Sequence, residues 1–400
     1  MTHTLPGAFS PNNVPIYHVL TPGDHFSPRT GSAIPTVVHG LASGAAIAGD
    51  AERYPQRVVV QSGTYTPRYE SAEAVEFPPA PPPTRRARTL DAALARFGIP
   101  RRGTAAYYAP AVQSLRSAPP GIVLAHNAAM LPWLLRDTAH KVALYAHNNV
   151  LRSFSRAEAS RMLRSSARIV CVSESLAGQL RERLPRSLHS RVRVVLNGVD
   201  TTQFRPPGTP VQRMTLCVMF LGRMIADKGP DLLLEAAAAL GRDDVEYLVV
   251  GSDGFDPSAS LTPFEQRLRE LAATVPGRVE FRPFVDRVRL PQLLQQADAV
   301  VVPSRWPDPC PLTVGETMAT GVPLIAARIG GIPEITGDSG VLFAPDNVQD
   351  LATALRKVLS DRRYREDRAA SGLERARLQN WAWSWRQLIQ VLDEVTDGAA

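Results

Sequence analysis

The sequence predicts an α/β protein made of two doubly wound parallel sheets. Short apolar runs recur along all 400 residues and alternate with segments of helical periodicity. The runs are continuous, as in KVALYA (141–146) and DAVVVP (298–303), which is typical of strands buried on both faces. Strands that alternate with helices form parallel sheets covered by helices on both sides.

The expected strands are divided evenly between the two halves of the chain. The first half contains PIYHVL (15–20), RVVVQS (57–62), GIVLAH (121–126), KVALYA (141–146), RIVCVS (168–173) and RVRVVL (191–196). The second half contains LCVMFLG (216–222), EYLVVG (246–251), RVEF (278–281), DAVVVP (298–303), PLIAA (323–327) and GVLF (340–343). Segments such as GPDLLLEAAAAL (229–240) and LPQLLQQA (290–297) are expected to be connecting helices.

Two domains are expected, because one hydrophobic core seldom covers so long a chain. The boundary falls in NGVDTTQFRPPGTPVQRM (197–214), which is rich in turn residues and has no periodicity. We expect a first domain at 1–197 and a second at 198–378. The amphipathic segment at 379–400 is expected to form a final helix that packs back towards the first domain. The proline run FPPAPPPT (77–84) indicates a surface excursion within the first domain.

The chain is basic, with a net charge of +7. Six arginines stand against Asp91 in TRRARTLDAALARFGIPRRG (84–103). This segment fits either an arginine-solvated surface or attraction to an anionic membrane leaflet or an anionic acceptor. Nucleic acid is not expected as a partner, because no basic motif with interleaved aromatic residues is present.

The chain shows no targeting or membrane-spanning segment. No apolar run reaches the roughly 18 residues that a bilayer requires, and the N-terminal residues do not resemble a signal peptide. Cys171, Cys217 and Cys310 are too scattered for a disulfide framework or a zinc site. We therefore expect a cytoplasmic enzyme, with peripheral contact at the inner face of the membrane as the alternative, and no metal site.

Two basic side chains follow the strand predicted at 216–222. Arg223 comes directly after it, and Lys228 precedes a helix whose Gly-Pro-Asp start is a good N-terminal signal. Ligands of open parallel sheets bind at the carboxyl ends of the strands. Two cations beside a helix N-terminus at that edge favour an anion such as a phosphate. The alternative is a solvated pair on a loop.

Two acids follow the strand predicted at 298–303, in PSRWPDPCPLTVGETMATG (303–321). Glu316 is expected in the first turn of a helix, where it would suit the helix dipole and could accept both hydroxyls of a ribose. Asp308 precedes that helix and could accept hydroxyls of a sugar. The structural alternatives are a capping acid for Glu316 and a turn-initiating Asp before Pro309 for Asp308.

These motifs resemble those of the family 4 retaining glycosyltransferases, which have the GT-B fold. FLGRMIADKG and PSRWPDPCPLTVGETMATGVPLIAARIGGIPE are similar to the donor-site motifs of that family, and the resemblance covers the entire second half. The first half is matched more loosely, through FSPRTGSAIPTVVHGLA, YAHNN and VCVSES. The resemblance implies two Rossmann-like domains that face each other across a cleft, the first binding the acceptor and the second the nucleotide-sugar donor.

The resemblance also assigns roles to individual residues. Arg223 and Lys228 would bind the donor diphosphate and stabilise the charge that grows on it. Glu316 would hold the ribose and Asp308 the transferred sugar, although the family usually has glutamate where Asp308 stands. The catalytic residues would be His147, Arg223, Lys228 and Asp308. The further donor-binding residues would be Gly31, Ser32, Phe284, Val285, Pro309, Cys310, Pro311, Leu312 and Thr313.

In the first half, Gly31 and Ser32 stand where the family commonly has a double glycine, so Ser32 departs from its pattern. His147 follows the strand at 141–146, where the family carries a histidine that faces the reacting sugar. Its imidazole could donate to a sugar hydroxyl or stabilise charge near the anomeric carbon. A histidine satisfied by local backbone is the alternative, and His126 is a weaker candidate.

The function implied is metal-independent transfer of a hexosyl unit from a UDP- or GDP-sugar to an acceptor hydroxyl, with retention of configuration and no cofactor. Such a hexosyltransferase would serve the biosynthesis of polysaccharides, glycolipids or glycosylated natural products, with a saccharide, a lipid-linked compound or a small molecule as acceptor. The chain contains no D-x-D pair of the kind that holds a divalent ion on a diphosphate. A sugar-nucleotide epimerase or hydrolase of the same fold, or a non-catalytic binding module, would share the nucleotide cradle.

Overall fold

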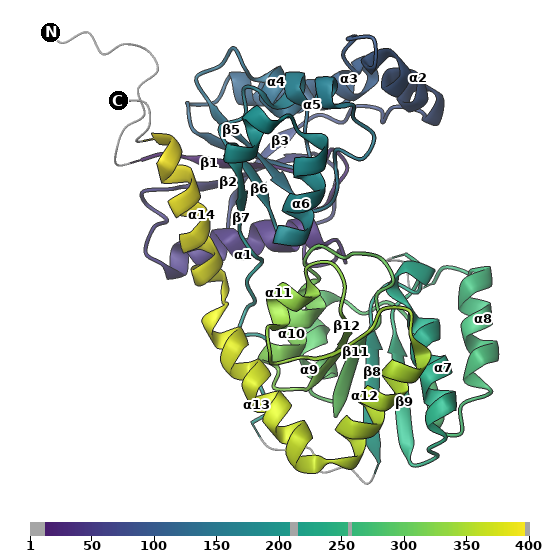
Figure 1. Ribbon diagram of the computed structural model, residues 1–400. Coiled ribbons are helices and arrows are strands. Elements are labelled where there is room, and N and C mark those ends of the chain that lie inside the picture. Colours follow the sequence, from purple (N-terminus) through teal and green to yellow (C-terminus); the bar gives the residue numbers. More distant parts are fainter. Residues whose placement is uncertain (1–12, 209–214, 255–257, 397–400) are drawn as a thin grey trace, which may run out of the picture. The chain divides into compact units, whose positions relative to one another are not determined.

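The structure is a computed structural model of the 400-residue chain and describes residues 13–208, 215–254 and 258–396. The described residues form two compact units (Figure 1). Unit 1 contains the chain up to Asn197 together with the final helix, and unit 2 runs from Gly198 to Asn380. Residues 209–214 of the predicted boundary segment lie outside the described part of the chain.

Unit 1 is built on a seven-stranded parallel sheet in the order β3-β2-β1-β4-β5-β6-β7. Its strands are β1 (Ile16–Val19), β2 (Gln56–Gln61), β3 (Glu73–Phe77), β4 (Ile122–His126), β5 (Lys141–Ala146), β6 (Ile169–Cys171) and β7 (Val192–Val194). Its helices are α1 (Ala33–Ile47), α2 (Arg85–Ala95), α3 (Arg102–Arg116), α4 (Leu131–Leu134), α5 (Arg156–Leu163), α6 (Glu174–Arg183), the 3₁₀ helix η1 (Arg186–Arg191) and α14 (Trp381–Thr396).

Unit 2 is built on a six-stranded parallel sheet in the order β10-β9-β8-β11-β12-β13. Its strands are β8 (Leu216–Leu221), β9 (Val245–Val250), β10 (Arg278–Arg282), β11 (Ala299–Val302), β12 (Leu324–Ala327) and β13 (Val341–Phe343). Its helices are η2 (Ala226–Lys228), α7 (Pro230–Leu240), α8 (Pro263–Ala272), η3 (Arg287–Arg289), α9 (Leu290–Leu294), α10 (Leu312–Ala319), α11 (Ile332–Thr336), α12 (Val348–Ser360) and α13 (Arg362–Leu378).

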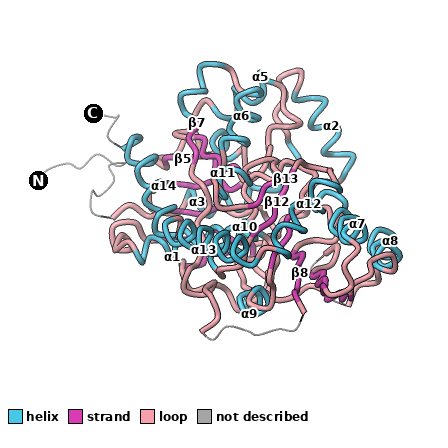
Figure 2. The backbone as a smooth tube through the Cα atoms, turned by 60° about the horizontal axis from the view of Figure 1, so that its bottom comes forward, coloured by secondary structure: helices cyan, strands magenta, loops and turns pink. Residues whose placement is uncertain are grey.

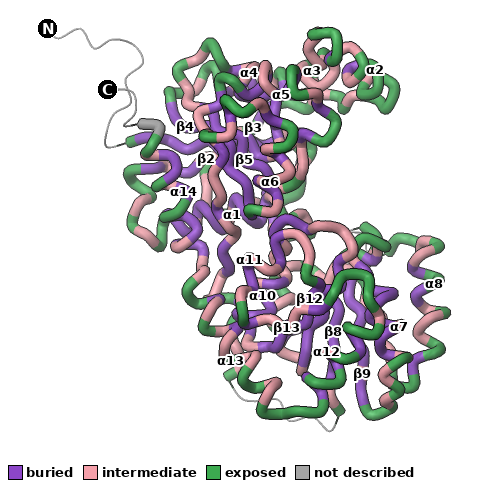
Figure 3. The backbone as a smooth tube through the Cα atoms, viewed as in Figure 1, coloured by how far each residue is buried: buried purple, intermediate pink, exposed green. Residues whose placement is uncertain are grey.

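The predicted α/β class is confirmed, and every predicted run contains a strand. The strands are largely buried in Figure 3, because helices cover the sheets. In unit 2, side chains of α7, α8 and α12 share one apolar cluster with one face of the sheet, and these helices lie side by side in Figures 1 and 2.

Strand β3 was not predicted from the sequence. Its residues, EAVEF, are mostly exposed or half-buried, because it lies at the edge of the sheet beside β2. Glu73 pairs with Arg57 (3.1 Å) and Glu76 with Arg68 (2.5 Å) on the exposed surface. An edge strand with charged side chains lacks the continuous apolar run that marks the inner strands.

The final helix α14 packs along α1, and two glycines of α1 make the close approach possible. A Cβ added at Gly40 would lie 2.1 Å from the Trp381 ring, and one at Gly44 would lie 2.3 Å from the Trp381 carbonyl oxygen. The indole of the buried Trp385 donates to Asp50 (2.8 Å). Helix α14 is thus part of the packed core of unit 1. Across the described ranges, no helix has the length and apolarity to cross a membrane.

Replacing Gly44 with alanine is expected to destabilise unit 1 by roughly 1–3 kcal/mol, because the new methyl group meets backbone that cannot rotate away. Gly178→Ala on α6 is the matched control, since a Cβ there meets nothing within 4 Å. The control should stabilise by about 0.5–1 kcal/mol, the usual gain for Gly→Ala within a helix. Urea unfolding of both variants measures the difference, and equal effects would contradict this packing.

Candidate functional site

The carboxyl edge of the unit 2 sheet is assembled by backbone contacts between successive loops. Gly251, after β9, has φ of +136°, and a Cβ there would lie 1.9 Å from the Gly222 carbonyl oxygen after β8. Ser252 extends this contact, because its carbonyl accepts from the Met224 N–H (3.0 Å) and its hydroxyl accepts from the Phe284 N–H (3.1 Å). The loops after β8, β9 and β10 therefore form one connected edge.

The loop after β8 is held equally closely against the end of β11. Gly229 has φ of +69° at the start of α7, and a Cβ there would lie 2.1 Å from the Pro303 carbonyl oxygen. Arg305, two residues further on, donates its N–H to the Asp227 carbonyl (2.9 Å). Its guanidinium reaches Asp231 in the first turn of α7 and Asp346, both at 2.6 Å. Arg305 thus clamps the start of α7 to the β11 loop, a role that sequence reasoning missed.

Arg223 and Lys228 both lie in the loop after β8, as predicted, but their surroundings differ. The Arg223 side chain is exposed and has no ion-pair partner among the described residues. Lys228 ends η2 and is half-buried, and its ammonium contacts the Asp308 carboxylate. The structure therefore brings Lys228 and Asp308 together from the carboxyl ends of the neighbouring strands β8 and β11.

Asp308 is buried, and its backbone is fixed by the loop after β12. Its carbonyl accepts from the Gly331 N–H (2.9 Å), and a Cβ at Gly330, whose φ is +61°, would lie 2.3 Å from the same oxygen. A buried carboxylate needs a charged or hydrogen-bonding partner. Lys228 supplies that charge here, so Asp308 is held in place from two sides.

Glu316 does not lie in the first turn of its helix, contrary to the prediction. Helix α10 begins at Leu312, directly after Pro311, whose φ of −67° suits a helix start, so Glu316 falls in the second turn. Its side chain is buried and contacts the Arg287 guanidinium of η3. That guanidinium also lies over the Phe204 ring, 5.6 Å from its centroid. Arg287 was not predicted from the sequence, because no sequence pattern relates it to Glu316, which lies in a different helix.

The remaining predicted donor-binding residues of unit 2 line the same edge. Pro309 and Cys310 are buried, whereas Leu312 and Thr313 are half-buried in the first turn of α10, where backbone N–H groups lack helical partners. Phe284 and Val285 follow β10 and are half-buried. Lys228 and Arg287 each pair with one carboxylate here, whereas Arg223 has no ion-pair partner among the described residues.

At the carboxyl edge of unit 1, Gly31 is exposed. Ser32 stands at the N-cap position of α1 with extended backbone, and its side chain makes no capping hydrogen bond. Asp24, in the loop after β1, was not predicted. Burial raises the pKa of its carboxyl group to about 6, although a hydrogen bond with Ser32 acts in the opposite direction. The sequence feature that could have indicated Asp24 is its position, as an acid in the loop after a predicted strand.

His147 follows β5 and belongs to a row of histidines. Its Nε2 lies 2.7 Å from Nδ1 of the fully buried His126, whose Nε2 lies 3.0 Å from Nδ1 of the fully buried His18. Burial lowers the pKa of His147 to about 3, that of His18 to about 4, and that of His126 well below its ordinary value. All three imidazoles are therefore neutral at physiological pH. His18 was missed, because a histidine inside an apolar run reveals no partner without the strand register.

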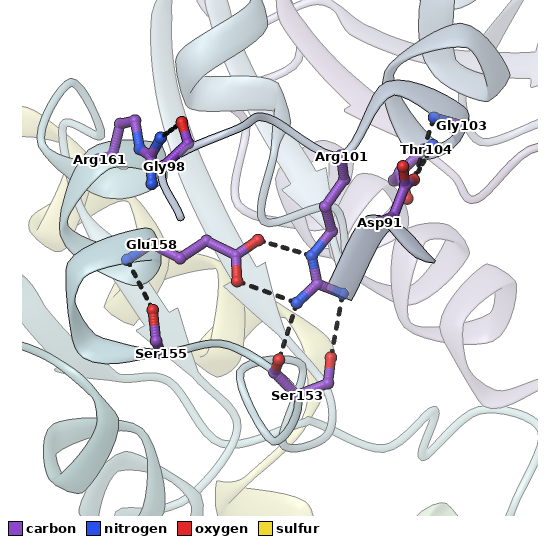
Figure 4. A network of polar contacts seen from close by, with 9 residues as sticks. All are labelled: Asp91, Gly98, Arg101, Gly103, Thr104, Ser153, Ser155, Glu158 and Arg161. Carbon is purple, nitrogen blue, oxygen red and sulfur yellow. Dashed lines mark hydrogen bonds and ion pairs between the residues drawn. The ribbon is translucent and has the colours of Figure 1, made fainter. Parts of the chain in front are cut away.

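Unit 1 also contains an arginine-lined cavity of about 600 Å³ on the carboxyl side of its sheet. It is lined by Arg85, Arg88, Thr89, Ala92, Ala93, Arg96, Arg101, Thr104 and Ser153. Figure 4 shows that Glu158 and Ser153 hold the Arg101 guanidinium, at 2.6–3.1 Å. Asp91 accepts from the N–H groups of Gly103 (3.0 Å) and Thr104 (3.2 Å), so its charge is committed to the start of α3.

The other cavity arginines, Arg85, Arg88 and Arg96, are exposed and have no ion-pair partner among the residues that the structure describes. The cavity is therefore strongly cationic. In the described ranges, no group of three or more His, Cys, Asp and Glu side chains is placed to hold a metal ion.

Comparison with known proteins identifies the family. Residues 50–203 match the family model described as Glycosyltransferase Family 4, and residues 215–361 match that described as Glycosyl transferases group 1. Together the two matches cover well over half of the chain. The chain belongs to the family 4 glycosyltransferases.

Curated relatives agree with this assignment over part of their length. A D-inositol 3-phosphate glycosyltransferase of Nocardioides sp. is 35% identical over 50% of this chain and 48% of its own length. Another of that name, from Rhodococcus opacus, is 31% identical over 63% of this chain and 61% of its own length. Spore coat protein SA of Bacillus subtilis is 29% identical over 64% of this chain and 73% of its own length. The chain thus spans about half to three fifths of the first two relatives.

Solved structures with the GT-B fold match nearly the whole glycosyltransferase chain. Sucrose-phosphate synthase from Thermosynechococcus elongatus has a TM-score of 0.74 at 20% identity, over 97% of this chain and all of that one. Anabaena HepE in complex with UDP-glucose has a TM-score of 0.72 at 17% identity, over 96% of this chain and all of that one. At such identities the matches show the fold alone, and they confirm the predicted GT-B class.

The neutral histidines predict an acid-sensitive unit 1. Between pH 6.5 and about 4 the unfolded chain protonates His18 whereas the folded unit does not, so folding stability falls as the pH is lowered. The loss is about 1.4 kcal/mol per pH unit for one such histidine. Asp24 acts in the opposite direction, because its folded pKa is raised. The test therefore compares two proteins. Between pH 7 and pH 5, urea unfolding should show a smaller fall in the free energy of unfolding for His18→Gln than for the wild type. An equal fall in both proteins would contradict the prediction.

Proposed function

We propose that this glycosyltransferase moves a hexosyl unit from a nucleotide-diphosphate sugar, a UDP- or GDP-sugar, to an acceptor hydroxyl, with retention of configuration and without a divalent ion. The contact between Lys228 and Asp308 carries the proposal, because it joins the predicted phosphate-binding loop to the predicted sugar-binding loop. Complexes of the fold neighbour HepE with UDP and UDP-glucose support this class of donor.

The charges of unit 2 suit a diphosphate leaving group. Arg223 is free to grip phosphate oxygens, and Lys228 can exchange the Asp308 carboxylate for a phosphate oxygen as the donor binds. The N–H groups of Leu312 and Thr313 in the first turn of α10 lack helical partners and would add donors for the same anion. These groups would stabilise the negative charge that develops as the glycosidic bond to the diphosphate breaks. No protein nucleophile and no metal is then required.

The acids are suited to the hydroxyls of the donor. Glu316 is held by Arg287 and would accept the ribose diol, while Asp308 would accept hydroxyls of the transferred sugar. Gly31 and Ser32 of unit 1 would approach the phosphates through their backbone, and Phe284 and Val285 would lie near the base. As the bond between the sugar and the diphosphate breaks, the leaving phosphate itself takes the proton of the acceptor hydroxyl.

We further propose that the acceptor carries an anionic group. The arginine-lined cavity of unit 1 supports this, because Arg85, Arg88 and Arg96 lack acidic partners among the described residues. A phosphate in the cavity would form charge-assisted hydrogen bonds with these guanidinium groups. The relatives named for D-inositol 3-phosphate support a phosphorylated compound. The same chemistry could come from a soluble metabolite or from an anionic lipid at the inner membrane face.

Arg223→Ala and Lys228→Ala should each lower turnover by roughly 100-fold or more, because each removes stabilisation of the leaving diphosphate. The assay follows nucleotide release from a panel of UDP- and GDP-sugars in EDTA-containing buffer, with and without acceptor. Arg267→Ala, an exposed arginine on α8, is the control and should leave turnover unchanged.

Each outcome of that assay discriminates between functions. Release that requires an acceptor supports transfer, whereas release without acceptor supports a hydrolase, and conversion of the donor sugar without release supports an epimerase. Tight donor binding with no turnover supports a binding module. Turnover that is absent in the EDTA-containing buffer and appears when EDTA is replaced by a divalent ion would contradict metal independence. Near-normal rates in both variants would reject the phosphate assignment.

Arg88→Ala and Arg96→Ala should each weaken acceptor binding roughly tenfold or more, the usual cost of one lost hydrogen bond to a charged group. Calorimetry with D-inositol 3-phosphate tests a soluble acceptor, and sedimentation with phosphatidylglycerol vesicles tests a lipid. Arg183→Ala on α6, also exposed and in unit 1, should change neither. Equal binding by wild type and cavity variants in both measurements would remove the cavity from the acceptor site.

A further inference from the structure

Four polar side chains form a diagonal row across the buried sheet of unit 1. The parallel register pairs Ile16 with Gln56, His18 with Leu124 and His126 with Tyr145. Going from Gln56 to His18, His126 and His147, each step moves one strand sideways and two residues towards the carboxyl edge. Because side chains two residues apart point to the same face of a sheet, all four lie on one face.

Hydrogen bonds connect the row from end to end. His147 Nε2 lies 2.7 Å from His126 Nδ1, and His126 Nε2 lies 3.0 Å from His18 Nδ1. His18 Nε2 lies 2.9 Å from the Gln56 side-chain oxygen, and the Gln56 amide nitrogen donates to the Tyr54 carbonyl at 2.6 Å. Gln56, His18 and His126 are buried, so water cannot replace these contacts.

The Tyr54 carbonyl sets the direction of every hydrogen bond in the row. A carbonyl only accepts, so the Gln56 NH₂ group must face it and the Gln56 oxygen must face His18. That oxygen also only accepts, so His18 carries its proton on Nε2. In a neutral imidazole the other nitrogen is then an acceptor. His18 Nδ1 therefore accepts from the His126 Nε2–H.

The same step repeats along the row. Because His126 carries its proton on Nε2, its Nδ1 accepts from the His147 Nε2–H. His147 is left with a lone pair on Nδ1, at the carboxyl edge of the sheet. The backbone N–H of His147 donates to the Asn127 side-chain oxygen (2.8 Å), and the His147 ring stacks with Tyr145 at 4.9 Å between centroids.

We propose that Gln56, His18 and His126 are positioning residues that lock His147 in the Nε2–H tautomer, so that its Nδ1 accepts a hydrogen bond from a hydroxyl of the bound substrate. The part concerning substrate rests on the proposed glycosyl transfer. It assigns His147 the role of acceptor, whereas the sequence suggested a donor to a sugar hydroxyl. Hydrogen bonds in such a row polarise one another, so the distant carbonyl strengthens the accepting nitrogen.

A buried structural histidine requires only that its nitrogens be satisfied. The row does more than this, because it imposes one tautomer on a half-buried residue three strands away from Gln56 on β2. That residue lies at the edge where ligands of parallel sheets bind. The imposed tautomer is thus the property that separates a positioning role from a purely structural one.

The test reads the tautomers directly by NMR of the full chain labelled with ¹⁵N-histidine, at neutral pH. Two-bond and three-bond correlations from the ring protons distinguish a protonated from an unprotonated ring nitrogen. His18, His126 and His147 should each show a protonated Nε2 and an unprotonated Nδ1. His140 is an internal reference, because its Nε2 faces the Leu115 carbonyl and its Nδ1 faces the Gly121 N–H. A protonated Nδ1 on His147 would overturn the proposal without recourse to any variant.

Gln56→Met keeps the length of the side chain and removes the acceptor that sets the direction. His147 should then show both neutral tautomers, while His140 is unchanged. Gln61→Met is the matched control, because Gln61 is on the same strand β2 but on its opposite face. A His147 tautomer that stays unchanged in Gln56→Met would overturn the proposal.

Turnover gives a second readout. If both tautomers of His147 become equally populated, the competent fraction halves, and kcat of Gln56→Met should fall about twofold relative to Gln61→Met. The NMR result needs no substrate, so it separates the two hypotheses. An Nε2–H row in a protein without transfer activity would reject the proposed function alone, whereas transfer activity with an Nδ1–H His147 would reject the row alone.

Discussion

Close backbone packing at two glycines of unit 2 determines where the side chains of Lys228 and Asp308 lie. Gly229 brings the loop after β8 against Pro303, and Gly330 brings the loop after β12 against Asp308, each so closely that a Cβ would overlap a carbonyl oxygen. Both glycines have positive φ, which other residues adopt only with strain. The contact between Lys228 and Asp308 follows from this packing, because neither side chain has to bridge a gap between separate loops.

Pairing explains how two acids are tolerated at a largely buried edge. An isolated carboxylate in such a place would cost several kcal/mol, whereas a pair with good geometry recovers much of that cost. Asp308 pairs with Lys228 and Glu316 pairs with Arg287, so each acid has a basic partner within unit 2. The exposed Arg223 has no ion-pair partner among the described residues. An anionic ligand that displaces Asp308 from Lys228 would be received by two basic side chains.

The sequence predicts those features that a short stretch of neighbouring residues determines. Continuous apolar runs mark the inner strands, and Gly229 with Pro230 marks the start of α7, because each signal comes from neighbouring residues. Strand β3 was missed because an edge strand needs no such run. Glu316 was placed one turn too early, because a shift of a single residue at Pro311 moves it out of the first turn. Arg287 and His18 depend on strand register and loop packing, which no local pattern contains.

In the proposed reaction, the neutral histidine row also bears on where the acceptor proton goes. The pKa of His147 is lowered to about 3 by burial, so its Nδ1 can accept a hydrogen bond but is a poor final site for a proton. The second pKa of a phosphate group is about 6. A proton leaving the acceptor hydroxyl is therefore bound more tightly by the departing phosphate than by His147. His147, which burial keeps neutral, can orient a hydroxyl without competing for its proton, and this is what transfer of the proton to the leaving group requires.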